Sequence, residues 1–98
     1  YFGDITYYIP DGGKGACGWN IQNSDMQIAL ARGMMGEQSN GNPWCNKKIK
    51  ILHDGIIHNT IIGDKCMGCD GESIDLTPAL WAVVAPDVDG RAHNVEWW

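Results

Sequence analysis

Two apolar runs joined by an Asp-Gly pair constrain the fold more than any other part of this sequence. Residues 48–53 begin with alternating lysine and isoleucine, and residues 56–62 are rich in isoleucine. Alternation with a period of two is typical of a β-strand buried on one face. The Asp54-Gly55 pair between the runs favours a two-residue type I′ turn. We therefore expect a β-hairpin whose second strand is central in its sheet, because both of its faces are partly apolar.

Alternation predicts two further strands. A third segment, residues 26–31, has helix-favouring residues, but its shortness and the glycines at 33 and 36 favour a strand, so the protein is expected to be mainly β. These segments are residues 3–9, residues 26–31 with a short turn behind them, and residues 91–97. In the first, Ile5, Tyr7 and Ile9 are predicted to face the core, with the polar Thr6 on the opposite face. In the last, Val95 and Trp97 are predicted to share one face.

A short helix is predicted to begin at Thr77-Pro78 and to end before Pro86. Threonine is a favoured N-cap residue, and proline is well tolerated at the first helical position. Spacing of i, i+3 and i+4 predicts a buried stripe along one side of this helix. The stripe consists of Leu80, Val83 and Val84. Trp81, inside the same helix, is expected to join the core.

Length and charge limit the classes of protein to consider. With 98 residues, the chain is expected to form a single domain, residues 1–98. Seven basic and twelve acidic residues give a net charge of −5, which argues against a nucleic-acid partner. The sequence has no apolar run of the roughly 18–20 residues that a membrane-spanning helix needs. We expect a secreted, extracellular monomer, and we interpret the start at Tyr1 as that of a processed form.

Four cysteines fit a small domain stabilised by disulfides. They allow three pairings, of which we favour Cys17–Cys45 with Cys66–Cys69. Two alternatives fit the spacing poorly. A zinc site usually requires a second pair of nearby ligands, and a thioredoxin-like redox pair requires a helix directly after the first cysteine. We therefore expect neither a metal nor a cofactor.

Asp64 and Asp75 are the acidic residues that the sequence places best for chemistry. Asp64 follows an apolar strand, and Asp75 lies between Ile74 and Leu76 just before the predicted helix. A pair of carboxylates facing one groove is what the cleavage of a glycosidic bond normally requires. The alternative is structural, because an aspartate at either place can also cap a turn or support the start of a helix.

The aromatic residues suggest a surface that binds sugar rings. Flat aromatic side chains stack on the apolar faces of sugars, although they serve equally well in a core. Trp19 and Trp44 adjoin loops rich in glycine and asparagine, and Tyr8 shares the polar strand face with Thr6. We therefore predict Tyr8, Trp19 and Trp44 as substrate-binding residues.

Five segments, taken together and in order, resemble one known family. They are Gly3-Asp4-Ile5-Thr6-Tyr7-Tyr8, Gly15-Ala16-Cys17-Gly18-Trp19, Asn42-Pro43-Trp44-Cys45-Asn46-Lys47-Lys48-Ile49, Gly63-Asp64-Lys65-Cys66 with Cys69, and Ile74-Asp75-Leu76-Thr77-Pro78-Ala79. In this order and spacing they resemble the expansin-related, rare-lipoprotein-A-like proteins, and most of all the single-domain fungal loosenin-like proteins. The resemblance covers nearly the whole chain.

The resemblance implies a six-stranded double-psi β-barrel with one or two short helices and a polar groove for extended polysaccharide. Asp75 matches the acid-type aspartate of the family, while Thr6 and Asp64 match the threonine and aspartate that accompany it. The resemblance thus implies that Thr6 is also a substrate-binding residue. A tyrosine of the family falls on Cys66. The catalytic base of the related hydrolases falls on Pro10, so hydrolysis is not expected.

These observations predict a secreted, non-hydrolytic protein that binds and loosens cell-wall polysaccharide, either cellulose or chitin. Asp75 and Asp64 are the predicted key acids, and insoluble polysaccharide is the predicted partner. Two alternatives remain open. The first is weak glycan cleavage of the endoglucanase or lytic-transglycosylase type. The second is a binding module that inhibits cysteine proteases.

Overall fold

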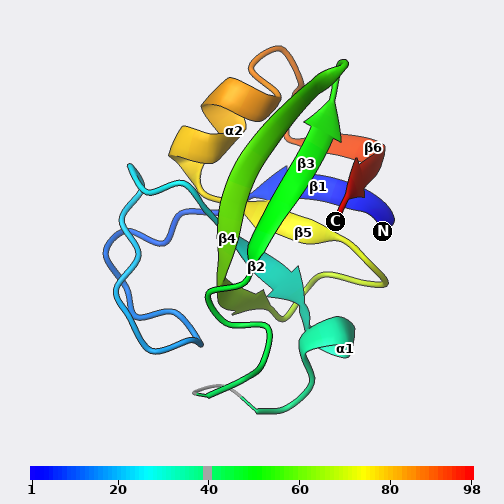
Figure 1. The fold of residues 1–98 in the computed structure, drawn as a ribbon. Helices are drawn as coiled ribbons and strands as arrows, with labels where there is room; N and C mark the ends of the chain where they lie inside the picture. The colour runs from blue at the N-terminus through cyan, green and yellow to red at the C-terminus, as the bar shows by residue number, and fades with distance from the viewer. Residues whose placement is uncertain (39–40) are drawn as a thin grey trace.

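A computed structural model describes residues 1–38 and 41–98, and six strands and two short helices are found in them (Figure 1). In chain order these are β1 (Phe2–Tyr7), β2 (Gln27–Ala31), α1 (Arg32–Met35), β3 (Lys48–His53), β4 (Ile56–Cys66), β5 (Ile74–Leu76), α2 (Pro78–Val84) and β6 (Arg91–Trp97).

The strands close into one barrel in the order β1-β5-β2-β4-β3-β6. β1 runs parallel to β5, and β2 runs parallel to β4, whereas the other described pairs are antiparallel. The predicted mainly β barrel with short helices is therefore confirmed. Strands far apart in sequence become neighbours, and this brings β1 and β5 side by side.

The hairpin that the Asp-Gly pair predicts is confirmed. β3 and β4 pair antiparallel from Lys48 opposite Ile61 to His53 opposite Ile56. Asp54 and Gly55 have φ angles of 51° and 76°, as a type I′ turn requires. β4 also pairs with β2, so it has a neighbour on each side, as predicted.

The predicted inner face of the first strand is wrong in part. Ile5 is fully buried, but Tyr7 is 47% exposed and Ile9 is 60% exposed. β1 ends at Tyr7, at the rim of the barrel, where the side chain leaves the core and its ring lies 5.4 Å from that of Trp81. Ile9 follows the end of the strand, so the alternation no longer positions it.

The helix α2 begins and ends where the sequence predicts, but its contacts differ from the prediction. Thr77 is the N-cap residue, yet its hydroxyl donates to the carbonyl of Asp25 and accepts from the amide of Gln27, so it joins the helix to β2. Val83 is 49% exposed, which corrects its predicted place in the buried stripe. Trp81 is buried, as predicted, on the side of the helix that faces the Tyr7 ring of β1.

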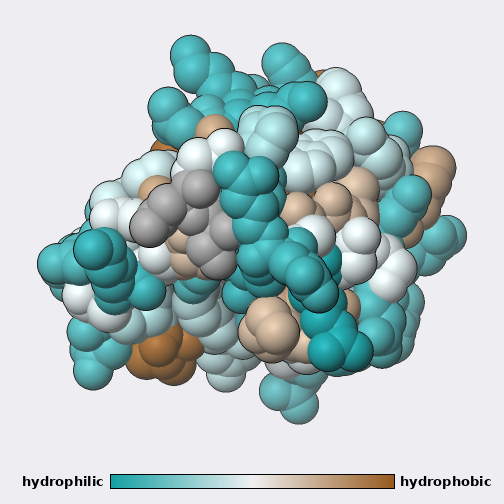
Figure 2. Space-filling model, turned by 90° about the horizontal axis from the view of Figure 1, so that it is seen from below, coloured by the Kyte–Doolittle hydropathy of each residue, from teal (hydrophilic) through white to brown (hydrophobic). Residues whose placement is uncertain are grey.

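The core fills the inside of the barrel. Its largest fully buried side chains are Trp97, Ile5, Ile21, Ile28, Leu30, Ile51, Ile62, Ile74, Leu76, Leu80 and Thr77. Val95 and Trp97 are both buried on one face of β6, as predicted. Among the described residues, neither helix is long and apolar enough to span a membrane. The end of the molecule seen from below is mainly hydrophilic, with apolar groups scattered over it (Figure 2).

Candidate functional site

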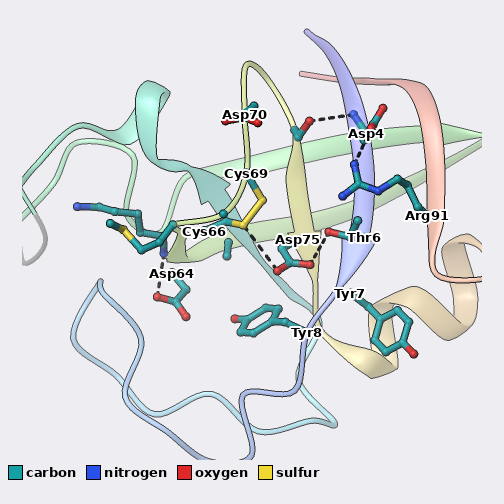
Figure 3. Close-up of a pocket in the computed structure, with 15 residues that line it drawn as sticks. Asp4, Thr6, Tyr7, Tyr8, Asp64, Cys66, Cys69, Asp70, Asp75 and Arg91 are labelled. Carbon is teal, nitrogen blue, oxygen red and sulfur yellow. Dashed lines mark hydrogen bonds and ion pairs between the residues drawn. A yellow bond between two sulfur atoms is a disulfide. The ribbon is translucent and has the colours of Figure 1, made fainter.

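A groove of about 530 Å³ lies where β1, β4 and β5 meet the loop between β4 and β5 (Figure 3). Thr6, Tyr8, Asp64 and Asp75 all line it. Four residues that the sequence analysis chose are thus gathered at one place. Their functional roles remain predictions.

Asp75 lies at the centre of the groove because β5 alternates. Ile74 and Leu76 are fully buried in the core, so the side chain between them points outward. The parallel pairing of β1 with β5 sets Thr6 opposite Asp75. The Thr6 hydroxyl donates a hydrogen bond of 2.7 Å to Asp75 Oδ1.

The environment of Asp75 favours its protonated form. Burial raises the pKa of this carboxyl, because loss of water disfavours the charge. The hydrogen bond from Thr6 and the charge of Arg91 oppose the rise in the pKa of Asp75, whereas the charge of Asp64 adds to it. The net direction is upward, so Asp75 keeps its proton to higher pH than an exposed aspartate does.

Asp64 is held by backbone amides. Its Oδ1 accepts from the N–H of Ala16 at 2.7 Å and from that of Lys65 at 2.8 Å. The first of these contacts ties the loop before β2 to β4. The same contact needs Gly15, because a Cβ there would lie 2.6 Å from the carbonyl oxygen of Gly63. Asp64 thus has the structural role that the sequence left open, and it also faces the groove.

Tyr8 lies beside Asp75, with its hydroxyl directed towards Asp64 (Figure 3). The hydroxyl oxygen is buried and has no hydrogen-bond partner among the described residues. Burial, and next the charge of Asp64, raise the pKa of Tyr8, so the phenol stays neutral. Tyr8 therefore presents a neutral ring to the groove.

An ion pair at one end of the groove was missed by the sequence analysis, which assigned no role to Asp4. Arg91 Nη1 lies 2.7 Å from Asp4 Oδ2, and His93 Nδ1 lies 3.1 Å from Asp4 Oδ1. The hydrogen bond from Arg91 is the main cause that lowers the pKa of Asp4. The alternation that places Thr6 and Tyr8 on the groove face also includes Asp4, and this was the available signal.

Trp19 and Trp44, two of the predicted sugar-stacking residues, do not line the groove. Trp19 Nε1 donates to Gln27 Oε1 at 2.9 Å, beside β2. Trp44 meets the edge of the Tyr1 ring at 6.2 Å. Tyr7, which was predicted to face the core, lines the groove instead.

Both predicted disulfides are present, Cys17–Cys45 and Cys66–Cys69. Within the described part of the chain, Cys66, Cys69 and Asp75 are the group of metal-type ligands that lie close together. The two sulfurs are bonded to each other, so they are not available as thiolate ligands. The arrangement does not fit a zinc site, which requires deprotonated cysteines.

Comparison with known proteins gives clear relatives, although no family model matches the chain. It is 40% identical over 109 residues to the Asp f 7 allergen homolog of Arthroderma benhamiae, which covers 97% of this chain but 37% of that protein. It is 32% identical over 98 residues to the papain inhibitor of Streptomyces mobaraensis, which covers 97% of this chain and 68% of the inhibitor. The chain thus spans little more than a third of the allergen homolog.

Comparison with solved structures identifies the fold. A Streptomyces papain inhibitor matches with a TM-score of 0.89 and 31% identity, over 99% of this chain and 90% of that one. An expansin of Clavibacter michiganensis matches with a TM-score of 0.80 and 17% identity, over 99% of this chain and 48% of that one. The fold is therefore that of the expansin-like double-psi β-barrels. Within this class, the chain belongs to the family of the Streptomyces papain inhibitor.

Proposed function

We propose that this protein is a secreted, non-hydrolytic polysaccharide-binding protein of the loosenin type, acting as a single barrel domain and a monomer. The observation that carries the proposal is the open groove in which Thr6 holds an acid with a raised pKa, Asp75. A variant of the Clavibacter expansin in complex with cellohexaose has the same fold, with a TM-score of 0.77. Cellulose is therefore the first polymer to test, and chitin the second.

Asp75 is the proposed acid of the groove. In its protonated form it donates to a glycan hydroxyl or to a glycosidic oxygen, and Thr6 fixes its orientation from the other side. Tyr8 provides aromatic surface beside it (Figure 3). Contacts of this kind compete with the hydrogen bonds between neighbouring glycan chains, and this competition separates the chains.

Two of the other groove carboxylates, Asp4 and Asp64, have contacts that support a non-hydrolytic function. Hydrolysis requires a second carboxylate as base or nucleophile. Both oxygens of Asp4 are engaged, by Arg91 and His93. One oxygen of Asp64 already accepts two backbone N–H groups. Asp11, near the position that matches the base of the related hydrolases, does not line the groove.

The test is a pull-down on insoluble cellulose and chitin, with release of soluble sugar and weakening of filter paper measured in parallel. The variants are Asp75→Asn and, as a matched control, Asp87→Asn on an exposed loop. We expect the wild type and the control to bind and weaken the polymer without releasing sugar. We expect the Asp75→Asn variant to lose most of the weakening.

Two outcomes would replace this proposal. Sugar or anhydro-muropeptide release that is abolished by Asp75→Asn would identify a glycan-cleaving enzyme. Absence of binding to either polymer would leave the second candidate function, which is inhibition of cysteine proteases.

Protease inhibition is favoured by one specific observation, the relationship to the papain inhibitor of Streptomyces mobaraensis. A papain assay over a range of inhibitor concentrations tests it directly. Inhibition that survives Asp75→Asn would assign this activity to a surface other than the groove centre. Inhibition together with glycan binding would give one barrel two functions.

A further inference from the structure

The two oxygens of Asp75 have different neighbours. Oδ1 accepts the hydrogen bond from the Thr6 hydroxyl, whereas Oδ2 lies 3.7 Å from Sγ of Cys66. That sulfur is bonded to Cys69 and carries no proton, so it has nothing to donate. The second oxygen of the acid thus faces a polarizable group that has no hydrogen bond to donate to it.

The disulfide is placed to have this effect. Cys66 ends β4, and Cys69 is 8% exposed in the loop that returns to β5, so the bridge forms a wall of the groove beside the acid (Figure 3). The bridge spans only three residues, and the Cys69 amide also donates to the Cys66 carbonyl at 3.4 Å. The sulfur is therefore fixed relative to Oδ2.

Groups on β1, β4 and β6 also act on Asp75. β1 contributes the Thr6 hydroxyl and places the Tyr8 phenol beside the acid, β4 contributes the charge of Asp64, β6 contributes the charge of Arg91, and Ala29 of β2 has no titratable group. Among these groups of the described residues, only the Thr6 hydroxyl donates a hydrogen bond to the Asp75 carboxylate. A second hydrogen-bond donor at the position of Cys66 would therefore change the environment of Asp75 directly.

We propose that the Cys66–Cys69 disulfide is a positioning element for Asp75, which holds a proton-free sulfur against Oδ2 and so keeps the proton of the acid on that oxygen. The inference rests on the proposed function in that it concerns the same groove acid. A donor in place of the sulfur would hydrogen-bond to the ionised carboxylate and favour loss of the proton.

A pair of double variants separates this effect from the mechanical role of the bridge. Cys66→Ser/Cys69→Ser and Cys66→Ala/Cys69→Ala both open the loop, but only serine can donate a hydrogen bond. The pKa of Asp75 is measured by NMR titration of its side-chain carboxyl carbon. We expect the serine variant to titrate about 1 pH unit below the alanine variant, which corresponds to one hydrogen bond to a charged group.

Equal Asp75 pKa values in the two variants would overturn the proposal and leave the bridge a loop constraint. If neither variant folds, reduction of the wild type gives the same comparison. A dithiol reductant supplies two electrons and two protons, opens the disulfide to two thiols and is itself oxidised to a cyclic disulfide. Peptide mapping verifies that Cys66 and Cys69 are the reduced pair.

The new Cys66 thiol stays protonated throughout the titration range of an aspartate, because an unperturbed thiol has a pKa of about 8.5. We expect the pKa of Asp75 to fall on reduction, and an unchanged value would also overturn the proposal. The titration requires no glycan, so its result is independent of whether the proposed function is correct.

Discussion

The Asp75 carboxyl links the groove to the stability of the whole domain. Its pKa is raised in the folded protein, so the folded state binds the proton more tightly than the unfolded chain does. The resulting stabilisation is fully present below the ordinary pKa of an aspartate. It is lost as pH rises through the raised pKa, because the charge must then form where water is scarce.

We therefore predict that Asp75→Asn is more stable than the wild type, by an amount that depends on pH. Asparagine keeps an oxygen for the Thr6 hydroxyl but cannot ionise, so the loss at higher pH disappears. We expect the free energy of unfolding of Asp75→Asn to exceed that of the wild type more at about pH 7 than at about pH 3. Urea unfolding at both pH values measures this difference. A constant difference would mean that ionisation of Asp75 carries no cost in the fold.

We predict that Thr6→Val loses stability. This loss should be larger at neutral pH than in acid, as is the gain for Asp75→Asn. The hydroxyl donates to Asp75 Oδ1, and this bond is strongest when the carboxyl is ionised. We expect a loss of about 1.5–3 kcal/mol at neutral pH and a smaller loss in acid. The matched control is Thr60→Val, which removes a hydroxyl that donates to the neutral carbonyl of Met26. The control should lose about 1 kcal/mol at both pH values, and the same flat response for Thr6→Val would contradict the prediction.

Among the elements, β5 does most to build the site, although it has only three residues. It pairs with β1 on one side and with β2 on the other, so its central side chain is fixed in the groove. The sequence predicted the β3–β4 hairpin, α2 and β6, because each has a turn, a cap or a sustained alternation. A strand of three residues is too short to show a period, so β5 was not predicted from the pattern.

The contacts of the site residues could not be predicted from the pattern either, because they join segments that are far apart in sequence. Asp75 was chosen from its place between two apolar residues and Thr6 through a family resemblance, but their hydrogen bond spans 69 positions of sequence and depends on the parallel β1–β5 pairing. Trp19 and Trp44 were chosen from their loops, where composition does not show which way a ring points. Their packing beside Gln27 and Tyr1 comes from tertiary contacts alone.

β1 and the loop before β5 are in close contact at Gly3, so we predict that a side chain at this position destabilises the fold. A Cβ at this position would lie 2.5 Å from the backbone carbon of Glu72. We expect Gly3→Ala to lose about 1–3 kcal/mol of unfolding free energy, because strands that carry groove residues must move apart. Gly33→Ala, in α1, is the control, since nothing lies within 4 Å of its added Cβ. It should be neutral or more stable by up to about 1 kcal/mol, and equal losses in both variants would contradict the steric argument.

For the whole molecule, the two disulfides have different functions. Cys17–Cys45 joins positions 28 residues apart, and both cysteines pack against the core cluster. Cys66–Cys69 joins positions only 3 residues apart at the groove wall. In the chain-entropy model, the stabilisation by a disulfide grows with the length of the loop that it closes. The first bridge should therefore mainly stabilise the fold, and the second should mainly shape the site.

The last prediction follows from this division. Cys17→Ala/Cys45→Ala should lower the free energy of unfolding by about 3.6 kcal/mol, against about 1.6 kcal/mol for Cys66→Ala/Cys69→Ala. Neither cysteine of the first pair lines the groove, so its removal should leave the pKa of Asp75 unchanged in the protein that still folds. Urea unfolding and the carboxyl titration measure the two effects on the same samples. A larger stability loss from the three-residue bridge would show that the loop between β4 and β5, rather than the long crosslink, holds the barrel closed.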